Sequence, residues 1–556
     1  MTPVERVKKA FSLIRERGKD GVWLSLVDER SALAQAEEVA ESGLPLAGLT
    51  FAVKDNIDVA GLPTTAACPA YSYRPKGNAF VVQRLLDAGA IVIGKTNLDQ
   101  FATGLNGTRT PHPIPRNVFN HDYIPGGSSA GSAVAVASGE VDFALGTDTA
   151  GSGRVPAAFN NLVGFKPTRG RWSNSGLVPA CRSLDCITVM TKTLGESLAV
   201  DAAVAAFDAA DPWSRRAPSG FHPRTGRVAV LALDQRDFFG DTDCAQLYAE
   251  ALRRAEALGW SLEEFDYAPF LEAAALLYTG PWVAERRAAL GTFFASHPED
   301  INPVVRGIVA GGDRFSAVQA FEAQYRLNEL VRTTSPLWER CDSMLLPTAG
   351  TIYTVAQMLA EPVALNSNLG RYTNFVNLMD LCAIAVPAGF RPDGLPFGVT
   401  FIGPAWTEPT QARLAGEFLG EPVHAVPPGH IRVAVVGAHL RGEPLNGQLL
   451  ELGGTFVTQT RTAPCYRLFA LPESRPPKPG LVRSEGGGSI EVEIWSLSEA
   501  AFGRFVAAIP APLGIGTISL EDGSSVPGFL CEGSAVRNAL DITYFGGWRA
   551  YRRSVG

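Results

Sequence analysis

The sequence of 556 residues lacks the patterns that mark membrane, secreted and nucleic-acid-binding proteins. No stretch reaches the roughly 18 consecutive apolar residues that cross a bilayer. The N-terminal segment MTPVERVKKAFSLIRERG carries charges throughout and holds no unbroken apolar stretch of a secretory signal. There is no run of lysine or arginine, and the net charge is −7. We therefore expect a cytoplasmic protein that acts on a small molecule and has neither a membrane nor a nucleic acid as partner.

Cysteine and histidine are scarce. The eight cysteines lie at scattered spacings without a C-x-x-C pair, and the closest two, Cys181 and Cys186, have no histidine nearby. This spacing matches neither a disulfide framework nor a zinc site, so we expect reduced thiols. We expect no metal and no cofactor.

A disordered composition is absent as well, because 57 glycines and 39 prolines fall below the share typical of low-complexity chains. Short apolar runs instead alternate with stretches of helical period. Residues 81–90 favour a helix and 91–97 a strand, and the stretch 226–267 favours strand, helix and strand in turn. Two longer helical stretches are predicted at about 270–295 and 317–340. The alternation predicts an α/β domain with a central sheet.

The character of the chain changes at 421–430, EPVHAVPPGH, which contains three prolines and a glycine. Beyond this segment, residues 432–440, 490–497 and 514–520 are strand-like, and helical periodicity is confined mainly to 497–508. We therefore predict two domains, a catalytic one over 1–425 and a small β-rich one over 430–556.

Two short motifs match known patterns but do not fit their surroundings. GAIVIGKT, from Gly89 to Thr96, matches the phosphate-loop pattern, yet its apolar β-branched residues favour a buried strand. GSSAG places Ser129 at the centre of a nucleophile-elbow pattern, but Pro125 stands where that motif needs a strand. Neither nucleotide binding nor a Ser-His-Asp triad is therefore favoured.

A longer constellation runs from Pro125 to Gly170, PGGSSAGSAVAVASGEVDFALGTDTAGSGRVPAAFNNLVGFKPTRG. A Gly-Gly-Ser-Ser turn and a Gly-Ser-Gly turn are joined in it by a small-residue helix and a strand, which can bring two hydroxyls together at one edge of a sheet. Upstream, Lys54 ends an apolar strand. Because desolvation lowers the pKa of a lysine, this side chain can serve as a base. The pattern predicts a base, a relay and a nucleophile.

Lys54 and the Gly/Ser-rich run closely resemble the amidase signature family, over roughly residues 1–425. The resemblance implies a mixed β-sheet core covered by helices, with Lys54 as the catalytic lysine and Ser152 as the nucleophile. It further implies that Ser128 is the bridging serine and follows a cis peptide bond from Gly127. No histidine is required for this chemistry.

The run from Asp148 to Ser152 has small or no side chains around its backbone N–H groups, which suits them to bind a tetrahedral oxyanion. Thr149, Ala150 and Gly151 are the oxyanion-hole candidates. Arg154, two residues past the nucleophile, is expected to hold the loop.

Substrate choice depends on residues outside this signature. In LLYTGPWVAERRAAL, Tyr278 and Arg286 lie on roughly one helix face if the Gly-Pro pair does not break it, and an arginine aimed into a site can clamp a carboxylate. This segment resembles allophanate hydrolases, a branch of the amidase signature family. Tyr278, Arg286 and Gly127 are therefore the substrate-binding candidates.

Residues 433–454 and 541–551 resemble the extra C-terminal domain of that branch, which has a γ-glutamylcyclotransferase-like fold. In the branch this domain is implicated in decarboxylation of N-carboxycarbamate, for which His439, with the nearby Asn446, is the candidate here. A lone histidine in a turn is also often structural.

The resemblance predicts an amidohydrolase that converts allophanate (urea-1-carboxylate) to ammonia and carbon dioxide. It implies a homodimer and a functional link to a separate urea carboxylase, in urea or triazine-ring catabolism. Three alternatives stay open: a general amidase acting on a neutral amide, a glutamine-amidase component of a transamidation complex, and a C-terminal half that only binds or dimerises.

Overall fold

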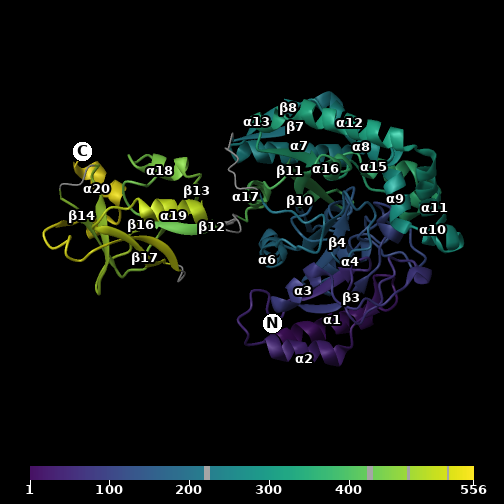
Figure 1. Cartoon of the computed structure of the whole chain (residues 1–556), viewed down its shortest axis with the longest axis horizontal. Helices are drawn as coiled ribbons and strands as arrows, with labels where there is room; N and C mark the ends of the chain where they lie inside the picture. The colour runs from purple at the N-terminus through teal and green to yellow at the C-terminus, as the bar shows by residue number, and fades with distance from the viewer. Residues whose placement is uncertain (218–225, 422–429, 473–475, 522–524, 556) are drawn as a thin grey trace. The chain divides into compact units, whose positions relative to one another are not determined.

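The computed structural model describes residues 1–217, 226–421, 430–472, 476–521 and 525–555. These residues form two compact units, which precede and follow residues 422–429 in the sequence (Figure 1). The predicted domain boundary, between 425 and 430, lies almost wholly outside the described residues. Each unit is considered by itself below.

The first unit is built on one sheet of eleven strands in the order β1-β3-β2-β4-β6-β5-β10-β11-β9-β7-β8. Its strands are β1 (Trp23–Leu26), β2 (Thr50–Lys54), β3 (Ile91–Thr96), β4 (Phe143–Asp148), β5 (Val163–Lys166), β6 (Cys186–Thr191), β7 (Arg227–Leu231), β8 (Ser261–Phe265), β9 (Ser343–Pro347), β10 (Leu381–Phe390) and β11 (Pro396–Pro404). Strand β2 runs parallel to β3 and β4, whereas β4, β6, β5, β10 and β11 pair antiparallel in succession. The sheet is therefore mixed, and the predicted α/β class is confirmed.

Helices cover this sheet. They are α1 (Pro3–Arg17), α2 (Glu29–Val39), α3 (Phe80–Asp87), α4 (Ala130–Ala137), α5 (Val155–Phe159), α6 (Leu194–Val204), α7 (Thr242–Ala257), α8 (Ala268–Thr279), α9 (Trp282–Leu290), α10 (Phe293–Ser296), α11 (Pro303–Ala310), α12 (Ala317–Thr334), α13 (Leu337–Arg340), α14 (Val355–Ala360), α15 (Ala364–Leu369), α16 (Phe375–Leu378) and α17 (Glu408–Leu419). Helix α4 is made of small residues and is almost entirely buried, so the sheet and its neighbours enclose it.

Side-chain alternation along β2 decides what faces α4. Phe51 and Val53 join the core cluster that includes α3, whereas Ala52 joins the cluster that contains the alanines and valines of α4. Because successive side chains of a strand point to opposite faces, Lys54 lies on the same face as Ala52. Strand β2 thus places the side chain of Lys54 on the face that packs against α4, close to Ser128.

The predicted single helical stretch at 270–295 is wrong. Helix α8 ends at Thr279 and α9 begins at Trp282, with Gly280 and Pro281 between them, and α10 follows as a separate short helix. Proline lacks the N–H that a continuous helix needs and clashes with the preceding turn. The break redirects the chain between Tyr278 and Arg286.

The second unit contains a five-stranded sheet in the order β13-β16-β12-β18-β17 and a three-stranded sheet in the order β15-β14-β19. Its elements are β12 (His430–Val435), α18 (Asn446–Glu451), β13 (Thr455–Arg461), β14 (Tyr466–Ala470), β15 (Pro479–Arg483), β16 (Glu491–Ser498), α19 (Glu499–Ala507), β17 (Leu513–Ser519), β18 (Ser525–Cys531), β19 (Leu540–Asp541) and α20 (Trp548–Val555). It has a core of its own, to which Val433, Trp495 and Phe529 contribute. The predicted small β-rich region is confirmed.

The helices offer no membrane span. Of those in the described parts of the chain, none is long and apolar enough to cross a bilayer.

Candidate active site

Lys54 ends β2 inside the protein with its side chain fully buried. Its Nζ lies 2.8 Å from Ser128 Oγ and 2.6 Å from Thr147 Oγ1. Burial lowers the pKa of Lys54 to about 7, although the nearby carboxylates of Asp99 and Asp185 oppose this shift. The predicted buried lysine with a lowered pKa is therefore present, and a large share of it is neutral near neutral pH.

Ser128 stands at the start of α4, and the peptide bond from Gly127 is cis, as the resemblance implied. Its carbonyl accepts a hydrogen bond from the backbone N–H of Asp99 at 3.1 Å. A Cβ at Gly127 would lie 2.2 Å from Asp99 Oδ2 and 2.6 Å from the backbone nitrogen of Gly107. Only glycine fits this position, which argues for a backbone role alongside the predicted contact with substrate.

Asp99 organises the loop that faces the two serines. Its buried carboxylate accepts the backbone N–H groups of Asn106, Gly107 and Arg109 at 3.2, 3.0 and 2.9 Å. The loop curls around this carboxylate and turns the carbonyl of Gly104 toward the turn that carries Ser152.

Ser152 lies buried between β4 and α5, and its Oγ donates to the carbonyl of Gly104 at 3.3 Å. Within the described residues its hydroxyl makes no hydrogen bond to Ser128. Lys54 is thus hydrogen-bonded directly to Ser128, whereas Ser152 is hydrogen-bonded to the carbonyl of Gly104. The predicted relay would require Ser152 to exchange Gly104 for Ser128 as its partner.

A buried ion pair braces the turn that carries Ser152. Asp148 accepts from Arg154 Nε at 2.9 Å and from the backbone N–H groups of Gly151 and Gly153 at 2.8 and 3.1 Å. Although burial alone would raise it, the pKa of Asp148 is held below its ordinary value by Arg154. Arg154 also reaches the carbonyl of Thr373 at 3.1 Å, so it holds the loop, as the sequence indicated.

The oxyanion-hole candidates differ in what their backbone N–H groups bind. The N–H of Gly151 is already donated to Asp148. For Thr149 and Ala150, no acceptor for the backbone N–H lies among the described residues. The side chain of Thr149 is anchored by Asp185, whose Oδ1 accepts from Thr149 Oγ1 at 2.5 Å. Thr149 and Ala150 are therefore the available donors in this arrangement, and Gly151 instead shapes the turn.

Arg286 and Tyr278 meet despite the break between their helices. Arg286 is buried, its Nη2 donates to Tyr278 Oη at 3.3 Å, and its Nη1 donates to Thr103 Oγ1 at 3.1 Å. Thr103 immediately precedes Gly104, whose carbonyl accepts from Ser152. Arg286 and the predicted nucleophile, Ser152, thus contact two adjacent residues of the same loop.

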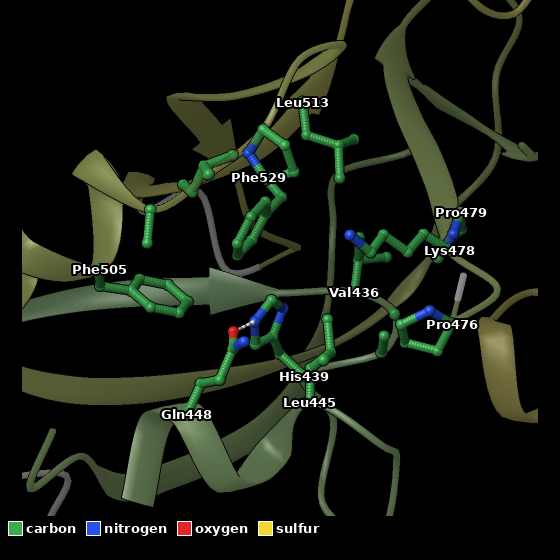
Figure 2. A pocket seen from close by; sticks show the side chains of 15 residues that line it. Val436, His439, Leu445, Gln448, Pro476, Lys478, Pro479, Phe505, Leu513 and Phe529 are labelled. Carbon is green, nitrogen blue, oxygen red and sulfur yellow. Dashed lines mark hydrogen bonds between the residues drawn. The ribbon is translucent and has the colours of Figure 1, made fainter. Parts of the chain in front are cut away.

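The second unit contains a separate cavity of about 270 Å³ around His439 (Figure 2). His439 Nε2 pairs with Gln448 Oε1 at 2.9 Å, and its ring stacks on Phe529 with the centroids 5.1 Å apart. Burial lowers the pKa of His439, and the charge of Lys478, which Figure 2 shows reaching into the cavity, adds to this. Asn446 donates to the carbonyl of His439 at 3.0 Å and so holds its turn.

The two motifs that did not fit their surroundings have structural roles here. Residues of the phosphate-loop match form β3, in which the buried Lys95 is paired with Asp55 at 2.9 Å. Ser129 exchanges two hydrogen bonds of 3.2 Å with the backbone of Thr147 and so ties α4 to β4.

Comparison with known proteins places this geometry in a family. A family model described as amidase matches residues 16–411. The chain belongs to the amidase signature family. A second model, described as the allophanate hydrolase C-terminal domain, matches residues 431–553.

Individual relatives agree with both matches. The urea amidolyase of Saccharomyces cerevisiae is 42% identical over 96% of this amidase signature chain, which spans only 31% of that relative's length. The urea amidolyase of Lachancea kluyveri is likewise 42% identical, over 99% of this chain and 32% of its own length. The structure of Kluyveromyces lactis allophanate hydrolase superposes with a TM-score of 0.79 at 39% identity, covering 100% of this chain and 97% of the other.

Several contacts of this amidase site escape sequence reasoning. Thr147 accepts from Lys54, Asp99 organises the facing loop, and Thr103 binds Arg286. Thr147 stands five residues before Ser152 on the predicted strand, and that position was its only signal. Asp99 and Thr103 act from an irregular loop, which no periodicity marks.

Proposed function

We propose that this chain is an allophanate hydrolase, an amidohydrolase that cleaves the ureido carbonyl of allophanate with release of ammonia. The observation that carries the proposal is that Arg286, which is bonded to Tyr278, also donates to Thr103, next to the residue that Ser152 contacts. A guanidinium group bonded to the loop that the nucleophile also contacts suits an amide that carries a carboxylate. The likeness to proteins named allophanate hydrolase and urea amidolyase over nearly all of this chain supports it.

The reaction begins with proton transfer. Neutral Lys54 takes the proton of Ser128, which takes that of Ser152 as Ser152 Oγ attacks the ureido carbonyl. The N–H groups of Thr149 and Ala150 bind the tetrahedral oxyanion. The relay then returns a proton to the leaving nitrogen, the C–N bond breaks, and ammonia departs from an acyl-enzyme.

Water completes the cycle. The same relay takes a proton from water as it attacks the acyl-enzyme, and the ester bond to Ser152 breaks. The product is N-carboxycarbamate, which carries two carboxylates. Loss of carbon dioxide and then of ammonia gives two ammonia and two carbon dioxide per allophanate.

The second unit is assigned the later step. The cavity at His439 admits a small molecule, and its walls are mostly apolar, with Gln448 and Lys478 as polar members. An apolar surrounding favours loss of carbon dioxide from a carboxylate because it removes the hydration of that charge. His439, which lines this cavity, is the residue that we assign to this step. We further propose a cytoplasmic homodimer supplied with allophanate by a separate urea carboxylase.

The test is ammonia release by the purified chain from allophanate, beside acetamide, benzamide, glutamine, biuret and urea, with Ser152→Ala as the blank. Turnover of allophanate that depends on Ser152 and far exceeds that of the other amides is expected. If the chain cleaves neutral amides but not allophanate, it is a general amidase and the substrate assignment is wrong. Arg286→Ala should lower the preference for allophanate, and the exposed Arg340→Ala is its matched control.

A further inference from the structure

Buried arginines separate into two kinds in the described chain. Arg154 and Arg171 are each paired with a carboxylate, Asp148 at 2.9 Å and Asp201 at 2.6 Å. Arg109 and Arg286 are equally buried, yet within the described residues neither has an ion pair. A buried guanidinium group without a counter-ion is costly, so its presence signals an anion that binds from outside.

The two unpaired guanidinium groups converge on one residue. Arg109 Nη1 donates to the carbonyl of Thr103 at 3.0 Å, and Arg286 Nη1 donates to the hydroxyl of the same residue at 3.1 Å. The second nitrogen of Arg109, Nη2, reaches the carbonyl of Pro362 at 2.5 Å. Both side chains are therefore held in place by neutral acceptors.

Each of these arginines has one N–H group without an acceptor in the described part of the chain. The Nε atoms of Arg109 and Arg286 are buried and have no hydrogen-bond acceptor within the described residues. Asp99, the carboxylate that acts most strongly on Arg109, already accepts three backbone N–H groups. Burial and, to a smaller extent, the charge of Arg286 lower the pKa of Arg109, so it is Arg109 whose cation the protein compensates less well.

We propose that Arg109 and Arg286 form a two-guanidinium anion site in which Arg109 is a second specificity-determining residue for the substrate carboxylate. This inference rests on the proposed function. A carboxylate offers about four lone-pair sites and accepts donors from two directions. It can therefore accept a hydrogen bond from each unsatisfied Nε group, and its negative charge reduces the repulsion between the two cations. A carboxamide in its place would bring its own N–H donors toward two cations. The pair therefore discriminates by charge more strongly than one arginine does.

The test compares allophanate with biuret, which has the same shape but a carboxamide where allophanate has its carboxylate. The ratio of the two kcat/KM values is measured for the unmodified chain, Arg109→Gln, Arg109→Lys and Arg286→Ala. Because a charge-assisted hydrogen bond is lost, Arg109→Gln should lower the ratio about tenfold or more. Arg109→Lys keeps the charge and should restore part of it. Arg116→Gln, an exposed arginine of the same segment, should leave the ratio unchanged.

A structural role for Arg109 gives a different result. If Arg109 only holds the carbonyls of Thr103 and Pro362, both substitutions lower the two kcat/KM values together, and an unchanged ratio overturns the proposal. If Arg109→Gln does not fold, Arg109→Lys alone decides, since its ratio must fall between that of the unmodified chain and that of Arg286→Ala. Failure of the proposed function looks unlike either case, because the unmodified chain would then show no preference for allophanate.

Discussion

At the scale of single residues, the chemistry of the site depends on which buried charges have partners. Lys54 is buried beside two hydroxyls and not beside a carboxylate in hydrogen-bond contact, so desolvation dominates its pKa. Asp148 is equally buried but is paired with Arg154. One lysine is thereby left able to lose its proton, whereas one aspartate is kept ionised.

The lowered pKa of Lys54 predicts the acid limb of the activity profile. A pKa of about 7 means that Lys54 gains a proton as the pH falls through that value, and a protonated lysine cannot accept the proton of Ser128. We therefore expect kcat/KM to fall with decreasing pH below about 7. Lys54→Arg keeps a permanent positive charge and should be inactive at every pH. Activity of Lys54→Arg that matched the unmodified chain would contradict the role of Lys54.

The Asp148–Arg154 pair predicts a large loss of stability on substitution. Arg154→Met removes one partner and leaves a buried carboxylate unpaired, which costs about 3–5 kcal/mol of unfolding free energy. Urea unfolding followed by circular dichroism measures the loss. Arg326→Met, in an exposed ion pair with Glu272, serves as the control and should change the stability little, since solvent screens an exposed pair. Equal losses for the two variants would show that burial of the pair does not matter.

At the scale of elements, close approach of backbones decides where the side chains of the site stand. Strand β2 delivers Lys54 to the face of α4, and the loop from Asp99 to Arg109 presses against Gly127. The break at Gly280 and Pro281 turns α9 so that Arg286 still reaches Tyr278. These placements depend on the ends of elements more than on their lengths.

The packing at Gly127 predicts an effect on both activity and stability. A Cβ there would meet Asp99 Oδ2 at 2.2 Å, so Gly127→Ala must displace the loop that carries Gly104. We expect a loss of about 1–3 kcal/mol of unfolding free energy and a clear fall in kcat. Gly195→Ala in α6 is the matched control, since a Cβ there would meet nothing within 4 Å. An active, stable Gly127→Ala would show that the loop yields easily.

The sequence predicts local features of this site better than distant ones. The buried strand ending at Lys54 and the small-residue helix after Ser128 follow from residue type and spacing alone. The Gly280-Pro281 pair marks a place where the helix can break, but the sequence does not decide whether it does, because proline bends some helices and ends others. The contacts of Thr103 and Arg109 could not be predicted, since the path of an irregular loop carries no residue signature.

At the scale of the whole molecule, two units with separate cores each hold a distinct candidate site. The first unit contains the buried Lys54, Ser128 and Ser152, whereas the second contains a mostly apolar cavity with a stacked histidine. Decarboxylation needs neither a nucleophile nor an oxyanion hole. Amide cleavage and decarboxylation therefore need different surroundings, and the two units each provide one of them.

This division predicts a split between the two ammonia molecules. His439→Ala should leave the initial rate of the first ammonia from allophanate unchanged and slow the release of the second. Time-resolved ammonia measurement together with ¹³C NMR of the accumulating N-carboxycarbamate distinguishes the two phases. His430→Ala, a β12 histidine that pairs with Ser496 at 3.1 Å, is the control and should leave both phases intact. Simultaneous release of both ammonia molecules by His439→Ala would argue for a purely structural histidine.

Thr103 and Gly104 connect the two halves of the site. Thr103 accepts hydrogen bonds from both unpaired guanidinium groups, and the carbonyl of the next residue, Gly104, accepts one from Ser152. The two arginines and the nucleophile are therefore bound to adjacent residues of one loop. Under the anion-site proposal, a substrate carboxylate that binds both arginines acts on the loop segment that also accepts the hydroxyl of Ser152. Release of Ser152 toward Ser128 would then depend on the charge of the bound molecule, and not only on occupancy of the site.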